Sequence, residues 1–236
     1  MKNVHLILQS KGGVGKSLFT WFIAQAEKET KTSFIDLDES TQTSANRLEY
    51  IVGSNRIRHF QILNDSKRLE REKIIALFES LSKAQSPTIY IDFGASESEE
   101  FNKLLAFDIP AEILKEELTQ LNINLQIIII LAGRDAFVSC YHYYEKLTQQ
   151  IGDVFPTQVL LNEGTFGSKD ALENVKLELA NNSITFKNFG NLGDSESGKD
   201  VIKLITEGKS DNSLNLMGRI TYKKAIEQIK SIIHHD

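Results

Sequence analysis

Residues 10–17 read SKGGVGKS and hold two lysines, Lys11 and Lys16, five positions apart in a glycine-rich segment. Two ammonium groups this close repel each other unless each has its own anionic partner. Glycines let the backbone curl so that successive N–H groups point inward at phosphate oxygens. The segment therefore predicts a phosphate-binding loop, and it raises the question of which anion Lys11 meets.

The segments on either side of this loop are those that a phosphate loop requires. A predicted strand over Val4–Leu8 precedes it, and a predicted helix over residues 17–29 follows. The N-terminus of that helix adds a favourable dipole, Lys16 would neutralise the outer phosphates of a nucleotide, and the Ser17 hydroxyl would ligate Mg²⁺. The predicted nucleotide-binding segment is Gly12, Gly13, Val14, Gly15, Lys16, Ser17 and Leu18.

The loop departs from the general pattern G-x-x-x-x-G-K-[ST], because Ser10 replaces the first glycine and Lys11 follows it. The sequence KGGVGKS resembles the deviant Walker A motif of the ParA/MinD family of ATPases. The resemblance implies ATP as the nucleotide. It also implies a dimer in which Lys11 reaches the phosphates bound by the partner subunit, as an arginine finger does in trans. The alternative is a solvent-facing lysine at the mouth of the loop.

Aspartates stand at the ends of two predicted strands. Asp36 and Asp38 in DLDES resemble the D-x-D switch of the family, and Asp92 in TIYID resembles a Walker B aspartate. The resemblance implies that Asp38 orients or deprotonates the attacking water, a task that suits a carboxylate. The alternative is acidic residues at strand-to-helix turns. The predicted catalytic set is Lys11, Lys16 and Asp38, and the predicted metal set is Ser17, Asp36 and Asp92.

A further polar residue, Asn162 in VLLNEG, ends another predicted strand. In the family an asparagine at this place often reads the adenine edge, because an amide both donates and accepts hydrogen bonds; the alternative is a turn-forming asparagine. Residues 92–96 (DFGAS) and 161–167 (LNEGTFG) resemble the plasmid-transfer branch, the TraL and StbB proteins. This resemblance implies a role in plasmid partition, stability or conjugative transfer.

The elements that must position these residues alternate along the chain, short β-branched runs with helix-length segments. This order predicts an α/β fold with a doubly wound, mostly parallel sheet flanked by helices, the three-layer sandwich of a P-loop NTPase, with the nucleotide at the carboxyl ends of the strands. Ser96 and Glu99 have the spacing of a capping box at one helix start. Further strands are expected over Ser33–Leu37, His59–Leu63, Thr88–Asp92, Leu125–Leu131, Thr157–Leu161 and Ser183–Phe189, and further helices over 67–83, 97–106, 110–121, 135–151, 168–180, 198–207 and 217–233.

Length and composition narrow the class of protein. The 236 residues contain no linker and predict a single domain, 1–236. A formal charge of −5 argues against a strongly basic nucleic-acid binder, and the single cysteine, Cys140, excludes an internal disulfide and a cysteine metal cluster. The N-terminus has no signal-peptide pattern, and the longest apolar run, Ile127–Ala132, is too short to cross a membrane. We expect a cytoplasmic protein without a transmembrane segment.

The last predicted helix has two faces of interest. One face is apolar and favours packing on the core, with a membrane-targeting helix as the alternative; it carries Tyr222, Ile226, Ile229 and Ile233. The other is basic and is either a solvated surface or a modest DNA contact after dimerisation; it carries Arg219, Lys223, Lys224 and Lys230.

The predicted partners are a second copy of the chain in an ATP-dependent homodimer, and non-specific DNA or a plasmid-encoded protein. Two functions of other classes stay open. One is a nucleotide-bound scaffold that does not hydrolyse ATP. The other is a metabolic phosphotransferase related to dethiobiotin synthetase, although no substrate-pocket signature accompanies the phosphate loop.

Overall fold

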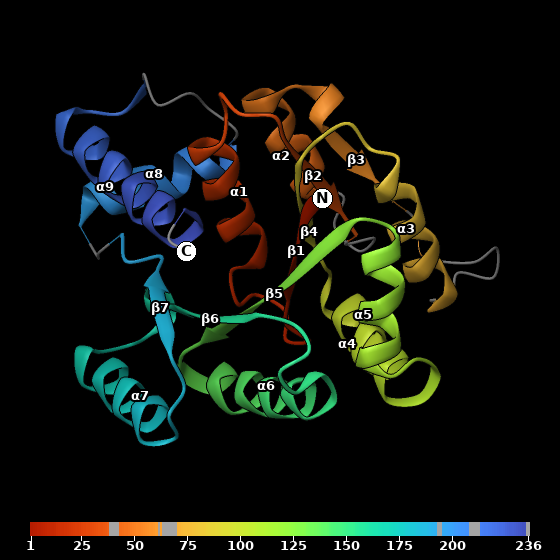
Figure 1. Cartoon of the computed structure of the whole chain (residues 1–236). Coiled ribbons are helices and arrows are strands. Elements are labelled where there is room, and N and C mark those ends of the chain that lie inside the picture. The colour runs from red at the N-terminus through yellow and green to blue at the C-terminus, as the bar shows by residue number, and fades with distance from the viewer. Residues whose placement is uncertain (38–42, 61, 63–69, 193–194, 208–212, 235–236) are drawn as a thin grey trace.

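The chain is built around one parallel sheet (Figure 1). The computed structural model describes residues 1–37, 43–60, 62, 70–192, 195–207 and 213–234, and only the backbone of 43–47. The seven strands lie in the order β3-β2-β4-β1-β5-β6-β7, and every neighbouring pair is parallel. They are β1 (Lys2–Leu8), β2 (Thr32–Asp36), β3 (Ile57–His59), β4 (Thr88–Asp92), β5 (Ile123–Ala132), β6 (Thr157–Asn162) and β7 (Phe186–Phe189).

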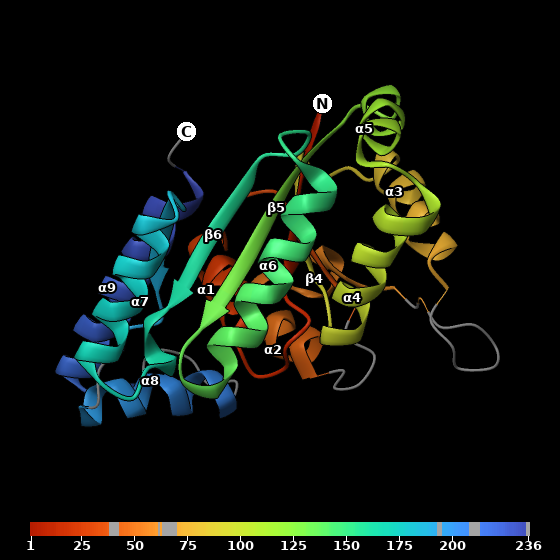
Figure 2. The ribbon, with the colours of Figure 1, turned by 90° about the horizontal axis from the view of Figure 1, so that it is seen from below.

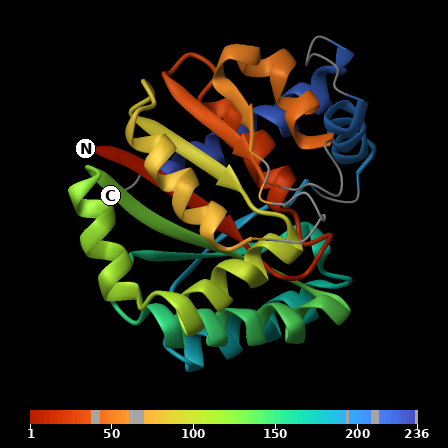
Figure 3. The ribbon, with the colours of Figure 1, turned by 90° about the vertical axis from the view of Figure 1, so that its right-hand side faces the viewer.

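Two layers of helices enclose this sheet, as Figure 3 shows from the side. The first layer contains α1 (Lys16–Ala26), α2 (Thr43–Val52), α8 (Glu196–Glu207) and α9 (Leu216–Ile233). The second layer contains α3 (Glu72–Ser82), α4 (Ala95–Lys103), α5 (Ala111–Gln120), α6 (Phe137–Ile151) and α7 (Lys169–Asn181), with α6 running alongside β5 (Figure 2). The predicted three-layer α/β sandwich is confirmed.

The sheet is buried on both faces, as parallel sheets with crossover helices are. In β5 every residue from Ile127 to Ala132 is at most 1% exposed. The chain leaves β1 for β2 and β3 at one edge, returns to β4, and then crosses β1 to β5, β6 and β7. The direction of winding therefore reverses beside β1. In open α/β sheets ligands bind outside the carboxyl ends of the strands at such a reversal, and here the glycine-rich loop follows β1.

Two local predictions were wrong, and one helix was missed. The strand expected over His59–Leu63 pairs instead over Ile57–His59, where it has three partners in β2; residues 61 and 63 lie outside the described residues. Helix α2 was not predicted. The capping box at Ser96 is absent, because α4 starts two residues earlier than predicted, at Ala95 with Gly94 as its N-cap. The Ser96 hydroxyl donates instead to the adjacent Glu97 carboxylate at 2.8 Å.

The apolar face of α9 packs on the core, as the commoner alternative predicted. Tyr222, Ile226 and Ile229 are at most 9% exposed, and Trp21 of α1 meets the Tyr222 ring edge-to-face at 6.2 Å. Of the basic residues on the same helix, Lys230 pairs with Glu227 at 2.8 Å. In the part of the chain that the structure describes, no helix has the length and apolar character needed to span a membrane.

Candidate functional site

The glycine-rich loop turns sharply between β1 and α1. Gly13 and Gly15 have φ of +76° and +105°, the left-handed region that favours glycine. Gly15 is also the N-cap of α1 and supplies no side chain to cap the helix. The first N–H groups of α1 therefore face the loop without a side-chain acceptor from the N-cap residue. A helix start of this kind is suited to an anion.

The two lysines of the loop lie in opposite environments. Lys16 is 8% exposed, and its Nζ atom donates to the carbonyls of Gln9 at 2.9 Å and Lys11 at 3.5 Å. Its ammonium group is thus held over the backbone at the start of the loop. Lys11, by contrast, has an exposed side chain. The predicted pair of lysines therefore does not converge within one chain.

The predicted aspartates come together at the carboxyl ends of adjacent strands. Asp36 ends β2, Asp92 ends β4, and the two are register partners, so both side chains project from the same face of the sheet. Each is 1% exposed. Asp38 lies outside the described residues. Within the described ranges, no cluster of three His, Cys, Asp or Glu side chains forms a metal site, so the predicted Mg²⁺ set offers two carboxylates and the half-buried Ser17 hydroxyl.

Asn162 holds the loop in place. Its Nδ2 atom donates to the Val14 carbonyl at 2.8 Å, and its side chain is 3% exposed. Gly15 and Gly190 flank this amide so closely that a Cβ atom on either would collide with it. The backbone turn after β6 is fixed by Thr165, whose hydroxyl donates to the Asn162 carbonyl at 2.7 Å. In this structure the amide nitrogen contacts the loop, and the adenine contact stays a prediction.

These segments surround a cavity of about 550 Å³, a volume in the ordinary range for small-molecule sites. The predicted segment Gly12–Leu18 lines the cavity, and so does Asn162, which contacts this segment through Val14. Other lining residues are Ala95, Ser96, Gly164, Thr165, Gly190 and Ile202. The positive-φ glycines, the helix start and Lys16 fit a nucleotide phosphate chain at this place.

Gln9, just before the loop, makes buried polar contacts beneath it. The Gln9 side chain donates to the Ile130 carbonyl at 2.8 Å, and its backbone N–H donates to the Ser98 hydroxyl at 3.1 Å. Burial raises the pKa of the neighbouring Cys140 thiol, with smaller opposing effects that include the Lys16 charge. Cys140 is therefore a neutral packing residue at pH 7.

The sequence analysis missed two cavity-lining residues that come from the part of the chain after β6. Ile202 of α8 and Gly190 after β7 both line the cavity, although neither follows a motif. A glycine directly after a strand, as at Gly190, was the available signal. Gly94, two residues after Asp92, is the N-cap of α4.

We expect Asn162→Ala to lower the free energy of unfolding by about 1–2 kcal/mol, because it removes the hydrogen bond to Val14 and leaves a buried carbonyl without that donor. Urea unfolding without nucleotide measures the effect. The control is Asn191→Ala, at an exposed position of the same side-chain type. An unchanged midpoint for Asn162→Ala would show that the loop is held without this bond.

The fold is the one found in solved P-loop proteins of the ParA/MinD type. The chain superposes on a Borrelia burgdorferi B31 protein described as a plasmid partition protein (BB_S35) and bound to AMPPNP, with a TM-score of 0.62 and 17% identity over 99% of this chain and 98% of that chain. MinD of Aquifex aeolicus gives 0.59 and 12%, over 99% and 98%. The ATP complex of an aspartate-to-alanine variant of Cyanothece McdA gives 0.54 and 17%, over 100% and 97%. The ParA/MinD resemblance is confirmed in the fold.

At the level of sequence the chain is similar to Protein TraL of Escherichia coli, with 30% identity over 163 residues. The match covers 68% of this chain and 61% of TraL, so the chain spans about three fifths of the relative's length. No protein-family model matches the chain. The similarity to TraL supports the plasmid-transfer branch that DFGAS and LNEGTFG predicted.

Proposed function

We propose that the chain is a Mg²⁺-dependent ATPase that closes into a homodimer when ATP is bound and acts as a switch in plasmid partition, stability or conjugative transfer. The observation that carries this proposal is the opposite placement of the two loop lysines. Lys16 is buried in its own loop, whereas Lys11, one residue before the lining segment Gly12–Leu18, is exposed. An exposed ammonium at the mouth of a phosphate site is positioned to meet an anion held by another molecule.

Each site residue has a role that its position supports. Lys16 and the first N–H groups of α1 would hold the phosphate chain, and Lys11 of the partner subunit would neutralise charge that develops during hydrolysis. Ser17, Asp36 and Asp92 would hold Mg²⁺ directly or through water. The metal supplies charge neutralisation on the phosphate oxygens when bound.

Hydrolysis requires a water aligned with the bond that breaks. A carboxylate can accept a hydrogen bond from that water and orient it, and we assign this role to Asp38, which follows the last residue of β2 by two positions in the sequence. Asn162 would contact the adenine edge from the turn after β6, after exchanging or sharing its bond to Val14. ATP-driven closure would then change the surface offered to non-specific DNA or to a plasmid-encoded protein.

For Asp38→Ala we expect unchanged ATP affinity, phosphate release reduced by roughly a hundredfold or more, and an ATP-bound dimer that persists. The loss follows because the variant binds the phosphates but no longer orients the water. Phosphate release under single-turnover conditions measures it, and Asp135→Ala, in the turn before α6, is the matched control. Wild-type turnover in Asp38→Ala would assign the water to another residue. A wild-type chain that binds ATP but releases no phosphate, with or without DNA, would favour the scaffold alternative.

A further inference from the structure

A second cavity, of about 570 Å³, lies at the other end of the sheet from the phosphate loop. It is lined by the residues that begin β2, including Thr30 and Lys31 just before the strand, and by the segment 83–86 that leads into β4. In a parallel sheet these amino ends are remote from the carboxyl ends that carry the phosphate loop. The two cavities share no lining residue.

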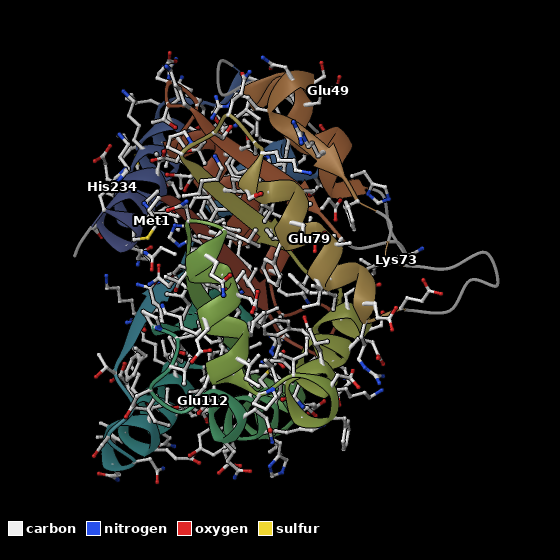
Figure 4. The ribbon with its side chains drawn as sticks, turned by 45° about the vertical axis from the view of Figure 1, so that its right-hand side comes forward. Met1, Glu49, Lys73, Glu79, Glu112 and His234 are labelled. Atoms are coloured by element: carbon white, nitrogen blue, oxygen red, sulfur yellow. The ribbon has the colours of Figure 1, made fainter. Side chains whose placement is uncertain are left out.

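Strand register explains why this cavity exists. Ile35 of β2 pairs with Arg58 of β3, and Ser33 pairs with Ile89 of β4, so these side chains project from one face of the sheet. Helix α3 covers only part of that face. Leu81, in the last turn of α3, lines one wall of the cavity that remains. Figure 4 labels Glu79 on α3 and Glu49 on α2, the two helices that flank this edge of the sheet. The short edge strand β3 leaves the cavity open on its outer side.

The charged residues that line the cavity, among those the structure describes, are all positive, although the chain has a net charge of −5. Lys31, Arg58 and Lys83 line it with exposed side chains, and none pairs with a carboxylate in the part of the chain that the structure describes. No aspartate or glutamate is among the described lining residues. Three cations with no described carboxylate among the lining residues give this cavity a positive potential, which favours an anion.

The fourth cation of the cavity, Arg56, has a structural task. Its guanidinium donates to the backbone carbonyls of Thr32 at 2.7 Å, Lys28 at 2.7 Å and Glu27 at 2.9 Å. The carboxylates that act on it electrostatically, Glu27 and Glu29, belong to the turn between α1 and β2. Arg56 thus fixes the wall, and the other three cations stay available to a ligand.

The remaining lining is suited to the rest of an organic molecule. Ile35, Ile89 and Leu81 are the buried aliphatic residues that line the cavity, each at most 4% exposed. The hydroxyls of two further lining residues, Ser33 and Ser86, are hydrogen-bonded to each other. The volume is far larger than inorganic phosphate needs and falls in the range of small-molecule sites. A planar guanidinium such as that of Arg58 matches phosphate oxygens in a bidentate fashion.

We propose that this cavity is a second ligand site, which binds a phosphorylated small molecule with an apolar part, of the nucleoside monophosphate class. Lys31, Arg58 and Lys83 hold the phosphate, and the aliphatic floor contacts the rest of the ligand. The site does not depend on the function assigned to the phosphate loop.

Titration calorimetry with AMP as the probe tests the site. The proteins compared are the wild type, Arg58→Gln and Lys83→Gln. The control is Lys223→Gln, which removes one positive charge from the exposed surface of α9. Each is also made together with Lys16→Ala, to exclude AMP bound at the phosphate loop. We expect AMP binding to survive Lys16→Ala and Lys223→Gln and to weaken roughly tenfold in Arg58→Gln and in Lys83→Gln. Inorganic phosphate should bind more weakly than AMP.

Three results would overturn the proposal. The first is AMP affinity that Arg58→Gln and Lys83→Gln both leave unchanged. The second is AMP binding that disappears with Lys16→Ala alone, which would assign all binding to the phosphate loop. The third is inorganic phosphate binding as tightly as AMP, which would exclude recognition of an organic phosphate.

Discussion

Lys16→Ala is expected to weaken ATP binding by roughly a hundredfold or more. The Lys16 ammonium is 8% exposed and already lies against the carbonyls of Gln9 and Lys11, at the centre of the loop. A charge held in so buried a place interacts strongly with a phosphate chain, and its removal leaves the helix N-terminus as the main remaining source of positive potential. Titration with a fluorescent ATP analogue in the presence of Mg²⁺ measures the affinity.

Two controls make this result specific. Lys223→Ala removes an exposed lysine on α9 and should leave the ATP affinity unchanged. Circular dichroism of Lys16→Ala should match the wild type, because the lysine contributes hydrogen bonds to the loop and not apolar packing. Undiminished ATP affinity in a folded Lys16→Ala chain would contradict the assignment of the loop.

We expect the ATP affinity of Lys11→Ala to stay within about threefold of the wild type. We expect its ATP turnover to fall by roughly a thousandfold, which is the scale of the effect of a positive charge supplied by a partner subunit. Lys11 is exposed and so contributes little to its own loop. Its loss should appear only when a second subunit closes over the nucleotide. Phosphate release at saturating ATP measures the turnover, and Lys11→Arg, which keeps the charge, should lose less.

Mixing two inactive variants separates trans action from action within one chain. Lys11→Ala binds ATP with its own Lys16, and Lys16→Ala still carries Lys11. In an equimolar mixture the heterodimer has one site with both lysines, so some turnover should return. Wild-type turnover by Lys11→Ala alone would show that Lys11 is only a surface residue.

Much of the fold follows from local patterns. Strand β4 occurs over the predicted Thr88–Asp92, and β6 extends the predicted strand by one residue to Asn162, because each is a short β-branched run between polar segments. Strand β3 was misplaced because an edge strand of three residues has little pattern of its own and is fixed by its pairing with β2. Helix α2 was missed because it too is fixed by contact with another element. Trp21 of α1 donates a hydrogen bond to its Tyr50 hydroxyl at 3.1 Å, a contact that no local pattern reveals.

The candidate site likewise has one part that the sequence predicts and one part that it does not. The positions of the loop, Asp36 and Asp92 were predictable, because each lies at the carboxyl end of a strand and these ends meet at one edge of the sheet. The bond from Asn162 to Val14 was not predictable, because it joins residues 148 positions apart. It also needs Gly190, where a side chain would collide with the amide. Such contacts depend on how β6 and β7 pack beside the loop.

The central claim is that ATP closes two copies of the chain over their phosphate sites. Sedimentation equilibrium of the wild type with Mg²⁺, with and without the non-hydrolysable analogue AMPPNP, tests it most directly. We predict a monomer without the analogue and twice the monomer mass with it, and we predict that Lys11→Ala stays monomeric while binding the analogue. A wild-type chain that is saturated with AMPPNP and still sediments as a monomer would contradict the account.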